Sequence, residues 1–306
     1  MDDVLKGQIN LNQEYGLRIS ESSLGSDYSM QAYYDLGTGE NVSSNLVIEW
    51  DIAIAKDDQH IILNSAKTNL RAAKIGGEWT DEVIPEEHEL DWDSPDGEIQ
   101  GRAIGLAMDE IFLIDRGSTG SGADTEQFGY KIGMLTTSDN GDFELLVADP
   151  DGENEQNFVI TFSEDHSYTF INLDSGIIEI APPAADWDLL FTSYLHIFDA
   201  ETFPFPYQVT GCMLNWEGVR AIELENTEFE SVDLSVINTD TFSQELDIIG
   251  YDWKIYDFDL GFIIRENRVY VIEDYEGDYY KLAFTSFYNA EGVKGNPQFE
   301  FQKLQP

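Results

Sequence analysis

One short pattern occurs twice in this chain and constrains its fold more than any other feature. The first copy reads Glu49-Trp50-Asp51-Ile52-Ala53-Ile54-Ala55, and the second reads Asp186-Trp187-Asp188-Leu189-Leu190-Phe191-Thr192. Each places an acid, a tryptophan and an aspartate before an apolar run rich in strand-forming residues. The chain has only six tryptophans among 306 residues, so two of them in one local pattern indicate an internal repeat.

A second matching piece lies upstream of each copy. Residues 33–39 precede the first copy and residues 170–176 precede the second, and each is an aromatic strand end that runs into a glycine turn. Further on, residues 111–115 match residues 269–273. The pattern predicts two related units in tandem, over residues 29–165 and 166–306, after a polar lead-in over residues 1–28.

The remaining local signals are those of strands and turns. Trp50, Ile52 and Ile54 alternate onto one face, and Asn140-Gly141 is a hairpin signal between apolar runs at 130–137 and 143–148. No segment has a long helical period, although residues 229–246 could hold a short helix. The sequence therefore predicts an all-β fold of two tandem related antiparallel β domains.

The charge balance limits the partners. Lys and Arg number 16 and Asp and Glu number 60, so the formal net charge is −44. Such a field repels nucleic acid and anionic membrane surfaces, and we expect no nucleic-acid partner. The acidity is typical of a salty or extracellular setting, and a dedicated cation store is the alternative.

Membrane and targeting signals are also missing from the sequence. No stretch approaches the roughly 18 apolar residues of a membrane span, so we expect no transmembrane segment. Met1-Asp2-Asp3 has neither the basic start nor the apolar core of a secretory leader. Two readings follow: a cytosolic protein, or a mature chain whose leader has been removed.

Catalytic motifs are missing too, and we predict that the protein is not an enzyme. The sequence has no nucleophile elbow, phosphate loop, dinucleotide fingerprint or His-Glu-x-x-His motif. Its one cysteine, Cys212, lies in a strand-like stretch and cannot form an internal disulfide, so we expect a buried, inert thiol. A pair of carboxylates at the spacing used by glycosidases is expected by chance among sixty acidic residues, so such a pair is no evidence for catalysis.

Three positions could bind a metal ion or haem iron. Asp149, Asp151 and Glu153 surround a glycine turn as in a calcium loop, but the full ligand spacing is missing and a solvated β-turn is favoured. His196 lies on a strand of buried type, where a core or edge histidine is the default over a ligand. Met213 is in the same way more typical of packing than of an iron ligand.

The quoted patterns resemble the HmuY-type haem-binding lipoproteins of Bacteroidetes. The first unit carries the resemblance in residues 50–54 and Asn64-Ser65, and the second carries it in residues 267–272, 281–285 and 299–301. The resemblance covers most of the chain from about Met30, as two copies. It implies an all-β protein at the outer-membrane surface, anchored by a lipidated cysteine, that captures haem without catalysing a reaction.

The resemblance also implies two axial side chains on the haem iron. An ungapped count places Tyr256 where the family's second axial histidine stands, before the Asn-Arg-Val strand. The first axial histidine has no counterpart in either unit, and the lipidated cysteine is expected to have been removed with the leader. For Tyr256, packing against Trp253 or Phe258 is the alternative to iron ligation.

Two functions from different classes follow. The first is a non-enzymatic extracellular or surface binding protein, with haem or another small ligand and an outer-membrane transporter as partners. The second is an adhesion or structural module that binds a protein or glycan through its acidic β surface, with the aromatic loop Phe203–Tyr207 as the contact.

Overall fold

The computed structural model describes residues 15–120, 125–198 and 205–305. The described residues divide into two compact units: unit 1 takes them from segments 1–44, 184–192 and 210–306, and unit 2 takes them from 45–183 and 193–209. The predicted lead-in lies outside the described residues up to position 14. These two compact units interleave along the sequence, so they differ from the two consecutive units predicted over residues 29–165 and 166–306. The consecutive units stay a prediction, which concerns the repeated sequence pattern.

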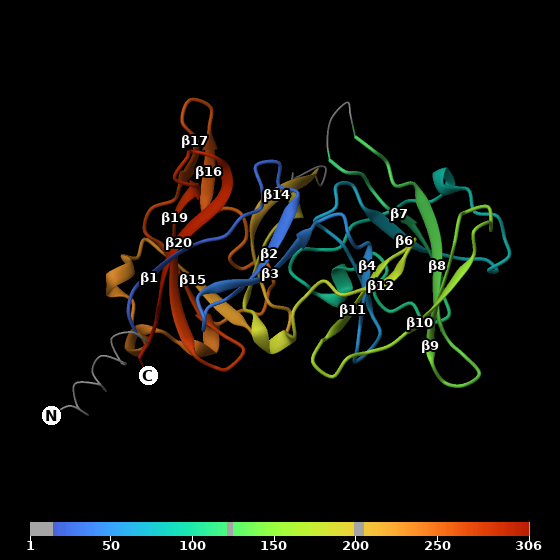
Figure 1. Cartoon of the computed structure of the whole chain (residues 1–306), viewed down its shortest axis with the longest axis horizontal. Helices are drawn as coiled ribbons and strands as arrows, with labels where there is room; N and C mark the ends of the chain where they lie inside the picture. The colour runs from blue at the N-terminus through green and yellow to red at the C-terminus, as the bar shows by residue number, and fades with distance from the viewer. Residues whose placement is uncertain (1–14, 121–124, 199–204, 306) are drawn as a thin grey trace. The chain divides into compact units, whose positions relative to one another are not determined.

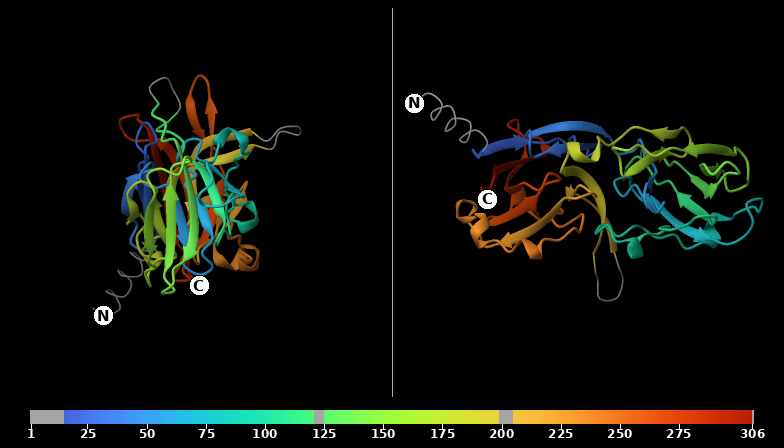
Figure 2. Two further views of the ribbon diagram at one scale, coloured as in Figure 1. Left: turned by 90° about the vertical axis from the view of Figure 1, so that its right-hand side faces the viewer. Right: turned by 90° about the horizontal axis from the view of Figure 1, so that it is seen from below.

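Unit 1 is built on two sheets. A five-stranded sheet has the order β1 (Arg18–Glu21), β20 (Lys294–Lys303), β19 (Tyr279–Tyr288), β18 (Arg268–Glu273) and β15 (Arg220–Glu225), and each of its neighbours is antiparallel. A second sheet, of which unit 1 holds the parts within residues 30–44, 189–192 and 210–214, has the order β14 (Phe205–Leu214), β13 (Leu189–Phe198), β2 (Met30–Asp35) and β3 (Glu40–Leu46). The dark blue β1 lies beside the red β20, so the two ends of the chain close one sheet (Figures 1 and 2).

The core of unit 1 lies between these two sheets and is unusually aromatic. Trp253 stacks on Phe284 with 3.9 Å between ring centroids, and Phe191 stacks on Phe299 at 5.3 Å. Short 3-10 turns connect the strands, at Ala184–Asp186, Phe229–Ser231, Leu234–Val236 and Thr239–Thr241. The core residues from the two sheets include Tyr34, Leu36, Leu189, Phe191, Cys212, Leu214, Ala221, Tyr270, Ile272, Leu282, Phe284, Phe299 and Phe301.

Unit 2 repeats this plan with other segments. Its five-stranded sheet has the order β10 (Gln156–Ile160), β9 (Phe143–Ala148), β8 (Tyr130–Thr137), β7 (Ile111–Asp115) and β6 (Arg71–Ile75). Its four-stranded sheet has the order β12 (Gly176–Ile178), β11 (Tyr168–Asn172), β4 (Ile52–Ala55) and β5 (Ile61–Leu63). Two 3-10 turns lie at Pro85–Glu87 and Ile99–Gly101. An aliphatic core between the sheets includes Ile52, Ile54, Leu63, Ile114, Leu135, Leu145 and Ile171.

The two repeated patterns pair across the sequence. The strand after Trp50 is β4, and it pairs with β11, the aromatic strand predicted to precede the other copy. In unit 1 the strand after Trp187 is β13, and it pairs with β2, which precedes the first copy in the sequence. All four residues of β4 are buried, as expected of a strand covered on both faces. Each unit therefore combines one Trp-Asp strand with the glycine-turn strand from the other half of the sequence.

The prediction of an all-β fold is confirmed. None of the described residues forms an α-helix, and the helix expected within residues 229–246 is replaced by three 3-10 turns. The described residues contain no helix that is long and apolar enough to cross a membrane. The prediction of an aromatic loop over Phe203–Tyr207 is partly wrong. Residues 203–204 lie outside the described residues, and Phe205–Tyr207 begin β14, whose backbone is hydrogen-bonded to β13.

Candidate functional site

The β16–β17 hairpin of unit 1 carries Tyr256 and presents apolar side chains to solvent. It consists of β16 (Lys254–Asp257) and β17 (Gly261–Ile264), drawn in orange-red near β19 and labelled in Figure 1. Its turn is fixed by the Asp257 carboxylate, which accepts hydrogen bonds from the backbone N–H groups of Asp259 and Leu260 at 2.8 and 2.9 Å. Such a loop, closed by its own side chain, holds its neighbours in one place without burying them.

Aromatic rings cover both strands of this hairpin. Tyr256 is 61% exposed, and its ring lies 5.8 Å from that of Phe258 and 5.2 Å from that of Phe262. Phe258 is 96% exposed and Leu260 is 73% exposed. The expected packing of Tyr256 against Phe258 is therefore observed, but it leaves the phenol facing water. Large apolar side chains gathered at such exposure indicate a contact surface.

The base of the hairpin is closely packed and hydrogen-bonded to the rest of unit 1. The Gly261 backbone has φ of +79°, and a Cβ there would lie 2.3 Å from the Tyr288 hydroxyl, which accepts a hydrogen bond from the Phe262 N–H at 2.8 Å. Lys254 is buried, donates to the carbonyls of Thr210 and Tyr251, and lies over the ring of Trp253 at 4.1 Å. Burial lowers the pKa of Lys254 to about 7, although nearby Asp252 acts in the opposite direction.

His196 lies in unit 2 within a second aromatic cluster. It is half-buried on β13, and its ring is 4.8 Å from that of Phe198. Phe198 in turn lies 6.4 Å from Tyr207, which stacks on Phe205 at 6.3 Å. Phe205 and Tyr207 are each 56% exposed. His196 is thus an edge histidine beside an exposed aromatic surface, and its role as a ligand stays a prediction.

Met213 has surroundings unlike those of Tyr256 and His196. It lies on β14 in unit 1 and is buried, and its carbonyl accepts a weak hydrogen bond from the Cys212 thiol at 3.9 Å. Cys212 is fully buried and is not in a disulfide, as expected. Burial raises its pKa far above the ordinary value for a thiol, so Cys212 is chemically inert at neutral pH.

The predicted calcium loop at Asp149 is a tight turn between β9 and β10. The Asp149 carboxylate accepts hydrogen bonds from Lys131 at 2.8 Å and from Asn154 at 2.6 Å. These bonds, that of Lys131 first, hold the pKa of Asp149 below its usual range. The Gly152 N–H bonds the Asp149 carbonyl at 2.8 Å in a β-turn, and the Asp151 carboxylate accepts from the Glu153 N–H at 3.0 Å in an Asx turn. A calcium ion would compete with the Lys131 ammonium for Asp149, and the calcium site stays a prediction.

Sequence reasoning missed a buried ionic cluster behind the first Trp-Asp pattern. Asp51 is fully buried in unit 2, where it bonds Lys67 Nζ at 2.5 Å and Arg116 Nη2 at 3.0 Å. Arg116 also bonds Asp174 at 2.6 Å, and Lys67 lies over the ring of Phe128 at 3.9 Å. The signal available in the sequence was the aspartate itself, which recurs at the same position of both Trp-Asp patterns, directly before an apolar strand. An aspartate that is buried in this way usually has a cationic partner.

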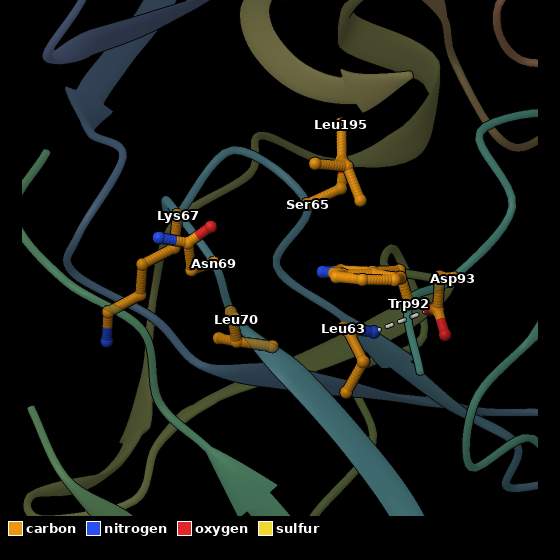
Figure 3. A pocket seen from close by; sticks show the side chains of 8 residues that line it. All are labelled: Leu63, Ser65, Lys67, Asn69, Leu70, Trp92, Asp93 and Leu195. Atoms are coloured by element: carbon orange, nitrogen blue, oxygen red, sulfur yellow. Dashed lines mark hydrogen bonds between the residues drawn. The ribbon is translucent and has the colours of Figure 1, made fainter. Parts of the chain in front are cut away.

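A small pocket lies beside this cluster in unit 2. Trp92 lies flat along one wall, and Leu195 and Lys67 come from other sides (Figure 3). The Asp93 carboxylate accepts a hydrogen bond from the Leu63 N–H at 2.8 Å, and it forms an ion pair with Arg102. The cavity volume is about 10 Å³, which is room for about one water molecule and far below the roughly 300–1,000 Å³ of typical ligand sites. The full lining is Leu63, Ser65, Lys67, Asn69, Leu70, Trp92, Asp93 and Leu195.

A second missed cluster lies behind the other Trp-Asp pattern, in unit 1. Carboxylate oxygens of Asp188, Asp274 and Glu276 lie within 4.8 Å of one another. Asp188 and Asp274 are buried and Glu276 is exposed. Asp188 accepts hydrogen bonds from the backbone N–H groups of Leu36 at 2.8 Å and Tyr275 at 3.3 Å.

Comparison with known proteins gives a family for this fold. The model of the family described as HmuY protein matches residues 27–301. Among solved structures, the apo HmuY analog of Tannerella forsythia is similar, with 11% identity, a TM-score of 0.38 and coverage of 96% of this chain and 98% of that chain. Apo PinO from Porphyromonas gingivitis has 10% identity, a TM-score of 0.38 and coverage of 94% and 97%.

A third similar structure is a HmuY-like heme binding protein from Bacteroides vulgatus, with 12% identity, a TM-score of 0.25 and coverage of 94% and 91%. No curated protein matches the chain. The family match is a single one over nearly the whole chain, and it confirms the family resemblance read from residues 50–54 and 267–301. The occurrence of the family pattern in two copies stays a prediction. This chain therefore belongs to the HmuY protein family.

Proposed function

We propose that this protein is a non-enzymatic haem-binding protein of the bacterial outer surface, and that haem docks on the β16–β17 hairpin. The observation that carries the proposal is the exposed phenol of Tyr256 between the rings of Phe258 and Phe262. The family, whose similar structures include one named as a heme binding protein, supports the ligand.

The chemistry of the hairpin suits a flat, apolar ligand that carries iron. A tyrosine oxygen is a known axial ligand of haem iron. The neighbouring aromatic side chains offer faces and edges on which a porphyrin ring can stack. Because the hairpin is closed by Asp257 and seated on Tyr288, little conformational entropy would be lost on binding.

The two propionates of haem are carboxylates, so a cationic side chain near the hairpin would favour binding. The chain has only 16 basic residues, so the candidates are few. Arg265 directly follows β17 and is exposed, and an arginine of this kind can form a bidentate bond to a carboxylate. Its positive charge also acts on Glu223 and Tyr251. Lys254 is nearer to the hairpin core but is buried among Trp253 and Phe287. Arg265 is therefore the proposed propionate partner.

The test is a haemin titration followed at the Soret band, in ferric and reduced forms. Wild type is expected to give a saturable, shifted band. Tyr256→Phe keeps the ring and removes the ligand oxygen, so it should abolish the shift and weaken binding by about tenfold or more. Arg265→Gln should weaken binding without moving the band.

Two further variants separate the alternative ligands. His196→Gln and Met213→Leu test the other two predicted ligands, and both should leave the band unchanged. A band lost in His196→Gln but kept in Tyr256→Phe would assign the iron to the aromatic cluster of unit 2 instead. A featureless spectrum in wild type would remove haem from the proposal altogether.

An adhesion or interaction module is the second candidate. It is favoured by the stacked pair Phe205 and Tyr207, whose exposed faces are the kind on which sugar rings or a partner's apolar side chains rest. Phe205→Ala with Tyr207→Ala should then abolish binding to a glycan panel or to intact cells, and haemin binding should not change. Surface binding that survives both substitutions would count against this candidate.

We further propose an extracellular location with a lipid anchor and an outer-membrane transporter as the partner that receives the ligand. The family supports this placement. Fractionation of the native organism, with and without protease treatment of intact cells, tests it. Full protection of the protein from external protease would contradict a surface location.

A further inference from the structure

The two Trp-Asp patterns build the same local arrangement around their aspartates. In unit 2 the Asp51 carboxylate accepts a hydrogen bond from the Leu173 N–H at 2.9 Å. In unit 1 the Asp188 carboxylate accepts one from the Leu36 N–H at 2.8 Å. The two leucines hold equivalent positions. Leu173 directly follows Asn172, the last residue of β11, and Leu36 directly follows Asp35, the last residue of β2. Each aspartate therefore ties its own strand to a glycine turn.

An asparagine completes each arrangement. Asn64 donates its side-chain N–H groups to the carbonyls of Val47 and Trp50, at 2.7 and 2.8 Å. Asn215 donates in the same way to the carbonyls of Ala184 and Trp187, at 2.8 and 2.7 Å. The match extends to backbone hydrogen bonds, since the N–H of each asparagine bonds the carbonyl of its aspartate. The two sites can therefore be compared atom for atom.

Their charges differ at two equivalent positions, since Gly218 lies three residues after Asn215 as Lys67 lies three after Asn64, and the position of Arg116 also differs. Arg116 follows β7 directly and bonds Asp51, which also bonds Lys67. Residues 111–115 match residues 269–273, so the equivalent of Arg116 is Asp274, which follows β18 directly. A guanidinium in one unit is thus replaced by a carboxylate in the other. The buried Asp188 meets a second acid where Asp51 meets a cation.

Most of the other charged groups around the pair are acidic, and Lys303, which acts on Asp274 with positive charge, forms its ion pair with Asp278 instead. Asp35 and Asp274 act on Asp188, and Glu276 and Asp278 act on Asp274, all with negative charge. Lys303 is the cation on this side, and it bonds Asp278 at 2.6 Å. Tyr280 also faces the group as a neutral phenol, with its pKa raised above the usual range mainly by burial. Within the described segments, neither Asp188 nor Asp274 forms an ion pair.

We propose that Asp188 and Asp274 share one proton in the folded protein, and that this proton replaces the guanidinium that neutralises Asp51 in unit 2. Two carboxylates this close and this buried cannot both be charged at low cost, as the shared proton of a carboxylate dyad illustrates. Burial raises the pKa of Asp188 to about 7, and Asp274 adds to the rise. Burial likewise raises that of Asp274 to about 6.

The shared proton makes unit 1 sensitive to pH. The folded pair holds a proton that the unfolded chain, with ordinary aspartate pKa values of 3.8, releases. Stability therefore falls as pH rises from about 4 to about 7, and the contribution of the proton is fully present only below that window. The elements that loosen are those bonded to Asp188, namely the turn at Leu36 and the turn at Tyr275.

Hydrogen exchange at the Leu36 and Tyr275 amides tests this in the whole protein. Protection factors, corrected for the intrinsic pH dependence of exchange, should fall about tenfold or more between pH 5 and pH 8 in wild type. Asp274→Asn keeps the shape and the acceptor for the Asp278 N–H but removes one charge. In that variant burial still raises the pKa of Asp188, so the factors should still fall with pH, but by a clearly smaller factor than in wild type.

Two controls separate the proposal from its rivals. Glu291→Gln removes an exposed acid elsewhere in unit 1 and should behave as wild type does. Titration with calcium against a chelator at pH 8 tests for a metal ion: protection restored by calcium in wild type but not in Asp274→Asn would show that a cation, not a proton, neutralises the pair. That result would overturn the proposal, as would equal pH dependence in wild type and Asp274→Asn.

An independent measurement covers the case in which the variant does not fold. A protonated buried carboxyl has a carbonyl stretch in the infrared that a carboxylate lacks, and wild type should lose one such band between pH 5 and pH 8. Persistence of the band at pH 8, or its absence at pH 5, would contradict the shared proton.

Discussion

Lys67 Nζ lies 2.5 Å from Asp51 Oδ1, and neither side chain is exposed to solvent. Arg116 bonds the other oxygen of Asp51, so the aspartate has two cationic partners inside unit 2. The desolvation of three charges is costly, and it is offset only because the geometry is complete. Burial lowers the pKa of Lys67, while Asp51 acts in the opposite direction.

Lys67→Met should destabilise unit 2 by about 3–5 kcal/mol, because it removes one partner from a buried ion pair and leaves the other in place. Urea unfolding followed by a probe in unit 2 measures the loss. Lys74→Met is the matched control, because Lys74 forms an exposed ion pair with Glu110 at 3.2 Å. It should cost no more than about 1 kcal/mol. Equal losses in the two variants would show that burial does not matter here.

The local elements of this fold could be predicted from the sequence, because turns and alternation are local properties. The strands expected at 130–137 and 143–148 are β8 and β9, and Asn140-Gly141 forms the turn between them. The strand expected at Met30–Leu36 is β2, one residue shorter. Periodicity could not show that β11 pairs with β4 and β2 with β13, because pairing partners are chosen by the whole core.

The candidate sites were less predictable than the strands. The position of Tyr256 came from the family pattern, but its exposure on a hairpin depends on the short strands β16 and β17, which no periodicity marked. The partners of Asp51 are 16 and 65 residues away in sequence, at Lys67 and Arg116. Contacts over such separations follow from sheet order, which the sequence pattern does not contain. The repeat itself was the available signal for the second aspartate, Asp188.

Lys254 should make stability depend on alkaline pH. Its pKa is about 7 when folded and 10.5 ordinarily, so between these values the unfolded chain binds more protons than the folded one. Stability therefore rises with pH from about 7 to about 10. In Lys254→Met this rise should disappear, at a cost of about 1–3 kcal/mol at pH 9 for each carbonyl, of Thr210 and Tyr251, left without a donor. Urea unfolding at several pH values measures both effects, and parallel curves for wild type and variant would refute the lowered pKa.

Gly133 is required by space rather than by backbone conformation. A Cβ there would lie 2.3 Å from the ring of Phe112, which is fully buried in the core of unit 2. Gly133→Ala should therefore cost about 1–3 kcal/mol through overpacking. Gly76→Ala is the control, since nothing lies within 4 Å of its added Cβ. Thermal unfolding of the two variants compares them, and a neutral Gly133→Ala would mean that Phe112 can move aside. Gly133→Ala with Phe112→Leu should recover part of the loss if the ring is the obstacle.

The net charge of −44 should make the whole protein salt-dependent. Exposed carboxylates repel one another over a Debye length of roughly 10 Å at 0.1 M salt and roughly 3 Å at 1 M. The melting temperature should therefore rise as sodium chloride increases over this range, and most of the rise should occur where screening changes fastest, at the low end. The buried pair Lys67–Asp51 is shielded from added ions, so the cost of Lys67→Met should hardly change with salt. Sucrose at matched osmolarity is the control. It is also excluded from the protein surface but carries no charge, so it cannot screen the repulsion between carboxylates. A melting temperature that is flat in salt, or that rises equally in sucrose, would mean that self-repulsion does not limit this fold, and the acidity would then have to serve a partner or a cation.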